Sequence, residues 1–236
     1  MGAWMSQVRG SRPARPGRRW RSLGAALLAW AGLAGLGGQA GAQPVQTDHV
    51  TAELVADTTA VQPGQTVRIG LRLQHIPHWH TYWRNPGDSG LPTTLTWTLP
   101  NGASVGEIDW PAPKRMPIGP LVNYGYEGEL LLPMSFTAPA TARPGSTLQL
   151  SAEATWLVCR DVCIPENATL KLALPVAEAG VTAGQTTHAP LFARTAERQA
   201  VPMKGWTAVL EHSGAELMLR LDREGGAAPA DPVPAV

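Results

Sequence analysis

Apolar residues alternate with polar residues along most of the chain after residue 48, and this period of two constrains the fold more than any other feature. The apolar members of the alternating segments are Val50 and Leu54; Val67, Ile69, Leu71 and Leu73; Leu95, Trp97 and Leu99; Leu130, Leu132, Met134 and Phe136; Leu148, Leu150, Ala152, Ala154 and Trp156; and Leu170, Leu172, Leu174 and Val176. A strand with this pattern buries one face and exposes the other, which is typical of antiparallel sheets.

The segments between these strands are rich in turn-forming residues. The 236 residues include 25 glycines and 22 prolines without a fixed repeat, which predicts many turns and few long helices. Strands and helices do not alternate along the chain, which argues against a parallel α/β sheet. We therefore expect an all-β fold, an immunoglobulin-like antiparallel β-sandwich spanning residues 48–178.

The pattern changes after residue 178. Residues 179–200 are predicted to be a linker with one short helix, Leu191 to Ala200. Two strands, 206–210 and 216–221, are predicted beyond it. Two strands cannot bury a core of their own, so we expect residues 201–236 to be a tail or the start of a second β-domain that this sequence does not complete.

The first 42 residues are predicted to be a secretory signal peptide. A segment with six arginines and no acidic residue precedes an apolar run, Leu23 to Leu36, and Ala40 and Ala42 then fit the −3 and −1 positions of a cleavage site. The apolar run is shorter than the roughly 20 residues that a membrane-spanning helix needs. We expect cleavage near Ala42 and export to the periplasm, where disulfide bonds are permitted.

The net charge of +1 conceals an acidic body. The chain has 19 basic and 18 acidic residues, but six of the basic residues lie in 1–42, so the remainder has a net charge of −5. An acidic body argues against nucleic-acid binding, because it offers no basic face for phosphates.

Only two cysteines are present, Cys159 and Cys163, too few for a disulfide-rich scaffold or a four-cysteine zinc site. Trp156 belongs to the inward-facing series, so we expect Cys159 where the strand leaves the sheet and both cysteines in an exposed loop. Three interpretations of the two cysteines remain open: a structural disulfide, a redox pair, or two ligands of a metal ion. A bond closing so short a loop stabilises by only roughly 2 kcal/mol, which favours the redox pair. Arg160 favours a thiolate and Asp161 opposes it.

Three histidines lie in a polar and aromatic stretch, HIPHWHTYWRNPGDSG, at residues 75–90. A copper or zinc site could use His75, His78 and His80 with the cysteines, Met116 or Met134. On a strand, His78 and His80 would share one face. The alternative, which we favour, is that the histidines and neighbouring aromatic residues cover a sheet edge or loop, with no metal bound.

Four motifs in order carry a family resemblance: HWHTYWRNPGDSGLPT, DWPAPKR, VNYGYEGELLLP and TWLVCRDVCIPE. Together they resemble the periplasmic N-terminal domain of the DsbD family of thiol:disulfide interchange proteins, and above all its ScsB-like branch, which is linked to copper tolerance. The resemblance covers about residues 48–178. The cysteine spacing is shorter than in the founding DsbD proteins and similar to that of the ScsB-like branch.

The resemblance implies an immunoglobulin-like sandwich that carries a redox dithiol and needs no cofactor. By this resemblance, Cys163 forms the mixed disulfide with partners and Cys159 resolves it. A loop of Tyr124, Gly125 and Tyr126 is expected to cap the disulfide until a partner displaces it, and Tyr82 is expected near the site.

The implied partners are thioredoxin-like periplasmic proteins, which serve as electron donor and acceptors, and the implied activity is protein-disulfide reduction. The 236 residues include neither the membrane electron-transfer domain nor the thioredoxin-like domain of the family. Two rival functions remain: a copper-binding module that uses the three histidines and the cysteines, or a redox-inert β-domain with a structural disulfide.

Overall fold

The computed structural model describes residues 41–224, except residues 179, 202 and 215. The predicted signal peptide lies outside the described residues apart from Gly41 and Ala42, which form a short strand. Among the described residues, no helix has the length and apolar character needed to cross a membrane.

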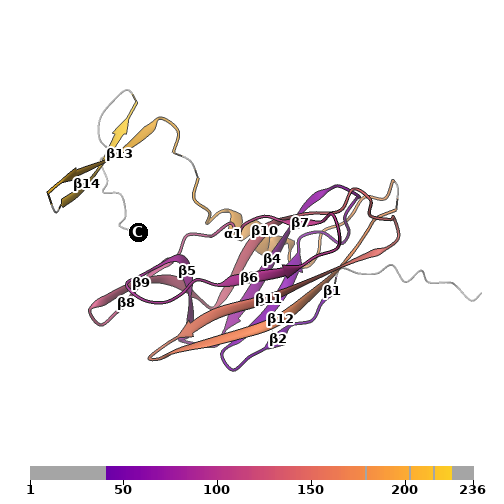
Figure 1. Cartoon of the computed structure of the whole chain (residues 1–236), viewed down its shortest axis with the longest axis horizontal. Coiled ribbons are helices and arrows are strands. Elements are labelled where there is room, and N and C mark those ends of the chain that lie inside the picture. Colours follow the sequence, from indigo (N-terminus) through magenta and orange to yellow (C-terminus); the bar gives the residue numbers. More distant parts are fainter. Residues whose placement is uncertain (1–40, 179, 202, 215, 225–236) are drawn as a thin grey trace, which may run out of the picture. The chain divides into compact units, whose positions relative to one another are not determined.

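Two antiparallel sheets form the body of the fold (Figure 1). The larger sheet has the order β1 (Gly41–Ala42), β12 (Cys163–Pro175), β11 (Thr147–Cys159), β5 (His80–Gly87), β9 (Leu121–Glu127) and β8 (Lys114–Ile118), and β6 (Thr94–Thr98) also pairs with β11. The second sheet has the order β2 (Val45–Gln46), β3 (Val50–Ala56), β4 (Thr66–His75), β10 (Glu129–Thr137) and β7 (Ser104–Val105). This architecture confirms the predicted all-β sandwich.

Side chains from both sheets fill one core. Leu71 of β4 and Leu132 of β10 pack with Leu150 and Trp156 of β11, and all four are at most 1% exposed. Every second residue of β11 from Leu148 onward is buried, as the alternation predicted. The residues between them point to the opposite face of the sheet, and Cys159 belongs to this second series.

The cysteines differ from their predicted setting. β11 ends at Cys159, as expected, but the two cysteines do not lie in an exposed loop: β12 begins at Cys163, so they face each other as the last pair of the ladder, and Cys159 is buried. β11 extends as far as Cys159 because it has partners along the edge that faces away from β12. Residues 151–155 pair with β6, and Cys159 pairs with His80 of β5.

The segment after residue 178 contains one helix, α1 (Ala189–Ala196). It begins two residues before the predicted helix, because Pro190 is suited to the first turn, and it ends four residues earlier, where the chain turns so that Gln199 pairs with Pro111. Phe192 of α1 packs against Val55 and Leu131 on the outer face of the second sheet.

A two-stranded hairpin, β13 (Trp206–Ser213) and β14 (Glu216–Arg223), follows α1. Every residue of β14 is exposed, including Leu217 and Leu219.

Candidate functional site

The central feature of the candidate site is a disulfide between Cys159 and Cys163, whose Cα atoms are 4.2 Å apart. Three residues connect the strands, and the amide of Arg160 donates to the carbonyl of Val162 to close the turn. The two cysteines differ in access: Cys159 is 1% exposed, whereas Cys163 is exposed. Of the two residues, Cys163 is therefore the one that solvent reaches.

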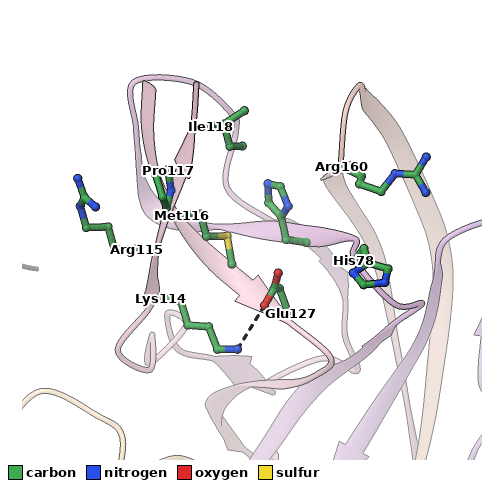
Figure 2. A pocket seen from close by; sticks show the side chains of 9 residues that line it. His78, Lys114, Arg115, Met116, Pro117, Ile118, Glu127 and Arg160 are labelled. Atoms are coloured by element: carbon green, nitrogen blue, oxygen red, sulfur yellow. Dashed lines mark hydrogen bonds and ion pairs between the residues drawn. The ribbon is translucent and has the colours of Figure 1, made fainter. Parts of the chain in front are cut away.

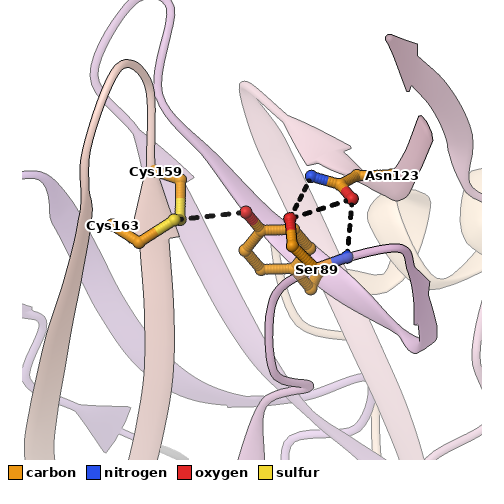
Figure 3. Close-up of a disulfide and its surroundings, with 5 residues drawn as sticks. Ser89, Asn123, Cys159 and Cys163 are labelled. Carbon is orange, nitrogen blue, oxygen red and sulfur yellow. Dashed lines mark hydrogen bonds between the residues drawn. A yellow bond between two sulfur atoms is a disulfide. The ribbon is translucent and has the colours of Figure 1, made fainter. Parts of the chain in front are cut away.

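Tyr82 covers the disulfide from the adjacent strand β5. Its hydroxyl donates to Sγ of Cys163 at 3.4 Å (Figure 3), although the side chain is only 1% exposed. Burial raises the pKa of Tyr82, so its hydroxyl remains a hydrogen-bond donor across the neutral range. The contact follows from the pairing of Cys159 with His80, since Tyr82 lies two residues further on the same face of β5.

A loop after β5 holds the Tyr82 ring in place. Gly90 has φ +102°, and a Cβ atom at this position would overlap the ring. The loop is fixed by Asn123, which is 1% exposed and whose Oδ1 accepts from the amide and the hydroxyl of Ser89 (Figure 3). The carboxylate of Asp88 accepts from the amide of Val122. The loop is thus bound to β9 at several points.

The three residues expected to form a capping loop lie instead within strand β9, because both neighbouring strands, β5 and β8, pair with them. Tyr126 belongs to the core, where its hydroxyl donates to the carbonyl of Pro111 at 2.7 Å. Gly125 is opposite Tyr82, and a side chain there would overlap the carbonyl of Thr81. Tyr124 is half-buried and makes an edge-to-face contact with Trp83, with ring centroids 6.4 Å apart. The role of these three residues as a cap stays a prediction.

The two charged residues of the turn pair with each other. Nε of Arg160 lies 2.8 Å from Oδ2 of Asp161, and both side chains are largely exposed. The Arg160 guanidinium also stacks over Trp79, 5.4 Å from the ring centroid. The two charges, which were expected to act in opposite directions on the thiolate, therefore form a direct ion pair. An ion pair exposed to solvent contributes little to the free energy of unfolding.

A buried carboxylate supports the base of the cysteine hairpin. Glu166, opposite Trp156, is 8% exposed and accepts hydrogen bonds from Thr47, from the amide and ring of His49 and from the Trp156 indole. Burial raises the pKa of Glu166, but these hydrogen bonds outweigh burial and hold the pKa below its usual value. Glu166 thereby ties the segment before β3 to β11 and β12.

The histidines of residues 75–80 are separated into different environments. His75 is buried, with its ring bonded to the Gly128 carbonyl and to Thr81. His78 is not on a strand, contrary to the expectation that it shares a face with His80, but in a turn with φ +70°. Burial lowers the pKa values of His75 and His80. No group of three or more His, Cys, Asp or Glu residues within the described part of the chain could hold a metal ion.

A groove of about 290 Å³ lies beside the cysteine hairpin (Figure 2). Strands β8 and β9 form one wall, and Arg160 lies on the other. Met116 lies within the groove, and Glu127 pairs with Lys114 at 3.3 Å (Figure 2). The groove could receive the side chain of a partner that approaches the disulfide.

Several residues of the site carried no signal in the sequence. Ser89, Asn123 and Glu166 are ordinary polar residues, and they become important only because distant strands are adjacent. The NPGDSG motif indicated a turn, but the alternation did not show that this turn rests on β9. By contrast, Cys159, Cys163 and Tyr82 were predicted together, and the structure brings all three into contact.

Comparison with known proteins adds independent evidence. A family model described as "Thiol:disulfide interchange protein DsbD, N-terminal" matches residues 48–175, more than half of the chain. The crystal structure of the N-terminal periplasmic domain of ScsB from Proteus mirabilis is similar in fold, with a TM-score of 0.58 and 22% identity, covering 78% of this chain and 69% of that chain. A yeast GGA1 GAE domain is more distant, at a TM-score of 0.31 and 13% identity, covering 58% of this chain and 100% of that chain. A search of curated proteins finds no match.

Proposed function

The chain belongs to the DsbD N-terminal domain family, and on that basis we propose that it carries reducing equivalents from a membrane-linked reductase to disulfide-bonded proteins of the periplasm. Its carrier is the Cys159–Cys163 pair, and its activity is protein-disulfide reduction. The observation that supports this proposal best is the unequal access of the two cysteines, since Cys163 is exposed and Cys159 is 1% exposed.

This asymmetry supports different roles for the two sulfurs. In the reduced protein, the Cys163 thiolate attacks a partner disulfide and forms a mixed disulfide. The Cys159 thiol, held opposite Cys163 by the strand ladder, then attacks Cys163 and releases the reduced partner. Recharging reverses these steps, with a partner thiolate attacking the accessible Cys163 sulfur.

The site is also built to limit unwanted reactions. Tyr82 covers Sγ of Cys163, and we assign an additional shielding role to Tyr124, Gly125 and Tyr126 of β9. Gly125 supports this role indirectly. Because it has no side chain, β9 can lie close to the Thr81 carbonyl of β5, next to Tyr82. Shielding would preserve the reduced dithiol in an oxidising compartment, where small thiols and oxidants compete with the true partner.

The partners that fit this chemistry are thioredoxin-like proteins, because they present a reactive dithiol or disulfide of their own. The similar domain of ScsB from Proteus mirabilis is periplasmic, and the basic and apolar first 42 residues support the same location for this chain. The groove beside Arg160 offers a contact surface next to the exposed sulfur.

Trapping the mixed disulfide tests the proposal. The Cys159→Ser variant retains the attacking sulfur but cannot resolve, so it should accumulate a covalent complex with an oxidised thioredoxin-like protein. The matched Cys163→Ser variant should accumulate far less, because its remaining sulfur is buried. Equal trapping by both variants would contradict the assigned roles.

The reduction potential separates this function from a structural disulfide. Equilibration of the wild-type protein with glutathione redox buffers should give a potential in the range of exchange proteins. A value well below roughly −300 mV would indicate a structural bond and contradict the proposal. The copper alternative gains no support from the three separated histidines.

A further inference from the structure

Four residues form a row across four neighbouring strands of the larger sheet. Cys163 of β12 is opposite Cys159 of β11, Cys159 is opposite His80 of β5, and His80 is opposite Glu127 of β9. Opposite residues in an antiparallel sheet point to the same face, with Cβ atoms about 4.5–5.5 Å apart. The row therefore places an imidazole between the buried cysteine and a carboxylate.

The surroundings of His80 leave one ring nitrogen unused. The residue is only 5% exposed, and within the described part of the chain Nε2 has no hydrogen-bond partner. The ring is held edge-on against Tyr82, with centroids 5.3 Å apart. A buried polar atom without a partner costs free energy and calls for an explanation. A proton transferred during the reaction provides one.

Cys159 creates the need for such an acceptor. A thiol must lose its proton before it can attack a disulfide. Because Cys159 is 1% exposed, water has little access to take that proton. The neighbouring residue in the row, His80, is the nearest basic side chain by strand register.

We propose that Nε2 of His80 accepts the proton of the Cys159 thiol during resolution of the mixed disulfide, and that Glu127 stabilises the resulting imidazolium; this assignment rests on the proposed exchange function. The S–H bond of Cys159 breaks and its proton moves to Nε2. The sulfur electron pair forms the bond to Sγ of Cys163, while the bond between Cys163 and the partner breaks. The partner leaves as a thiolate that carries the two electrons.

The charges around His80 agree with this role. Burial lowers the pKa of His80, so the ring is neutral and able to accept a proton at neutral pH, while Glu127 acts in the opposite direction. Lys114 of β8 pairs with Glu127, and the groove also contains Arg115 and Arg160. His78 lines the groove, and the buried His75 of β4 interacts electrostatically with His80.

A two-step colour assay tests the proposal on the whole chain. The reduced protein is mixed with a nitrobenzoate disulfide whose thiolate product absorbs visible light. The first release reports attack by Cys163, and the second reports resolution by Cys159. We expect His80→Gln to slow the second release by roughly a hundredfold and to leave the first nearly unchanged. The matched variant His188→Gln, at the start of α1 and outside the groove, should behave as wild type in both steps.

The pH profile distinguishes a proton acceptor from a structural residue. In the wild type, the second rate should level off above the pKa of His80, whereas in His80→Gln it should rise until the thiol itself ionises. Glu127→Gln replaces an exposed carboxylate and leaves the core unchanged. Because this carboxylate raises the pKa of His80, the variant should show the inflection of the second rate at a lower pH than the wild type. An unchanged rate and profile in both variants would overturn the role of His80. No second release from the wild type would instead contradict the exchange function itself.

Discussion

The hydroxyl of Tyr82 lies 3.4 Å from Sγ of Cys163, although 81 residues separate the two in sequence. This contact becomes stronger when the sulfur is reduced, because a hydrogen bond to a thiolate is assisted by charge. On the proposed exchange function, Tyr82 would therefore stabilise the attacking thiolate of Cys163 as well as cover its sulfur.

Replacing Tyr82 with Phe removes this hydroxyl and retains the ring. We expect alkylation of reduced Cys163 at neutral pH to slow by about threefold to tenfold, as the loss of one charge-assisted hydrogen bond at a partly exposed site implies. The rate of iodoacetamide labelling measures the effect. Tyr126→Phe, which loses a hydroxyl bonded to Pro111, is the matched control and should label at the wild-type rate. Equal rates for Tyr82→Phe and wild type would exclude a role for the hydroxyl.

Gly90 fixes the loop that holds the Tyr82 ring. Gly90→Ala should lower the free energy of unfolding by about 1–3 kcal/mol more than Gly119→Ala, because only the former forces a Cβ against the ring. Both glycines have positive φ, +102° and +59°, so the backbone strain is present in each variant. Urea denaturation compares the two. Equal destabilisation would show that the ring moves aside freely.

Glu166 makes the fold sensitive to acid. Its pKa is lower in the folded than in the unfolded protein, so its stabilisation is complete above the unfolded value of about 4.5 and is lost as the pH falls through the folded value. We expect Glu166→Gln to cost about 1–3 kcal/mol at neutral pH and progressively less below about pH 4. Urea midpoints across pH measure this difference. Glu153→Gln, an exposed change on β11, should show no such difference, and a constant gap for Glu166→Gln would contradict the assignment.

Tyr124 provides the test of shielding. If the family's cap operates in this chain, Tyr124→Ala should increase several-fold the rate at which oxidised glutathione converts the reduced dithiol to the disulfide; the substitution removes a half-buried ring that contacts Trp83 and leaves the core closed. Thiol titration over time measures this rate. Tyr126 is less suitable for truncation, since it is a core residue whose loss would destabilise the fold. An unchanged oxidation rate would count against a cap.

The sequence predicted best those features that depend on the local alternation of apolar and polar residues. The alternation along residues 148–156 and 170–176 predicted the two long strands and their buried faces. The short spacing of Cys159 and Cys163 left several interpretations open, and the family resemblance implied that they form a redox pair. The sequence could not predict that β5 lies beside the end of β11, because alternation shows which residues share a face and not which strand is adjacent. For this reason the setting of His80, the Asn123 contacts and the Glu166 cluster emerged only from the structure.

The ladder between β11 and β12 pairs thirteen residues on each strand and ends at the cysteines. Backbone hydrogen bonds therefore keep the two sulfurs together whether or not they are bonded. Each thiol experiences the other at a high effective concentration, and closing the bond costs little chain entropy. On the proposed exchange function, strand pairing would add to the reducing power of the dithiol, and the carrier could be charged and discharged repeatedly without refolding.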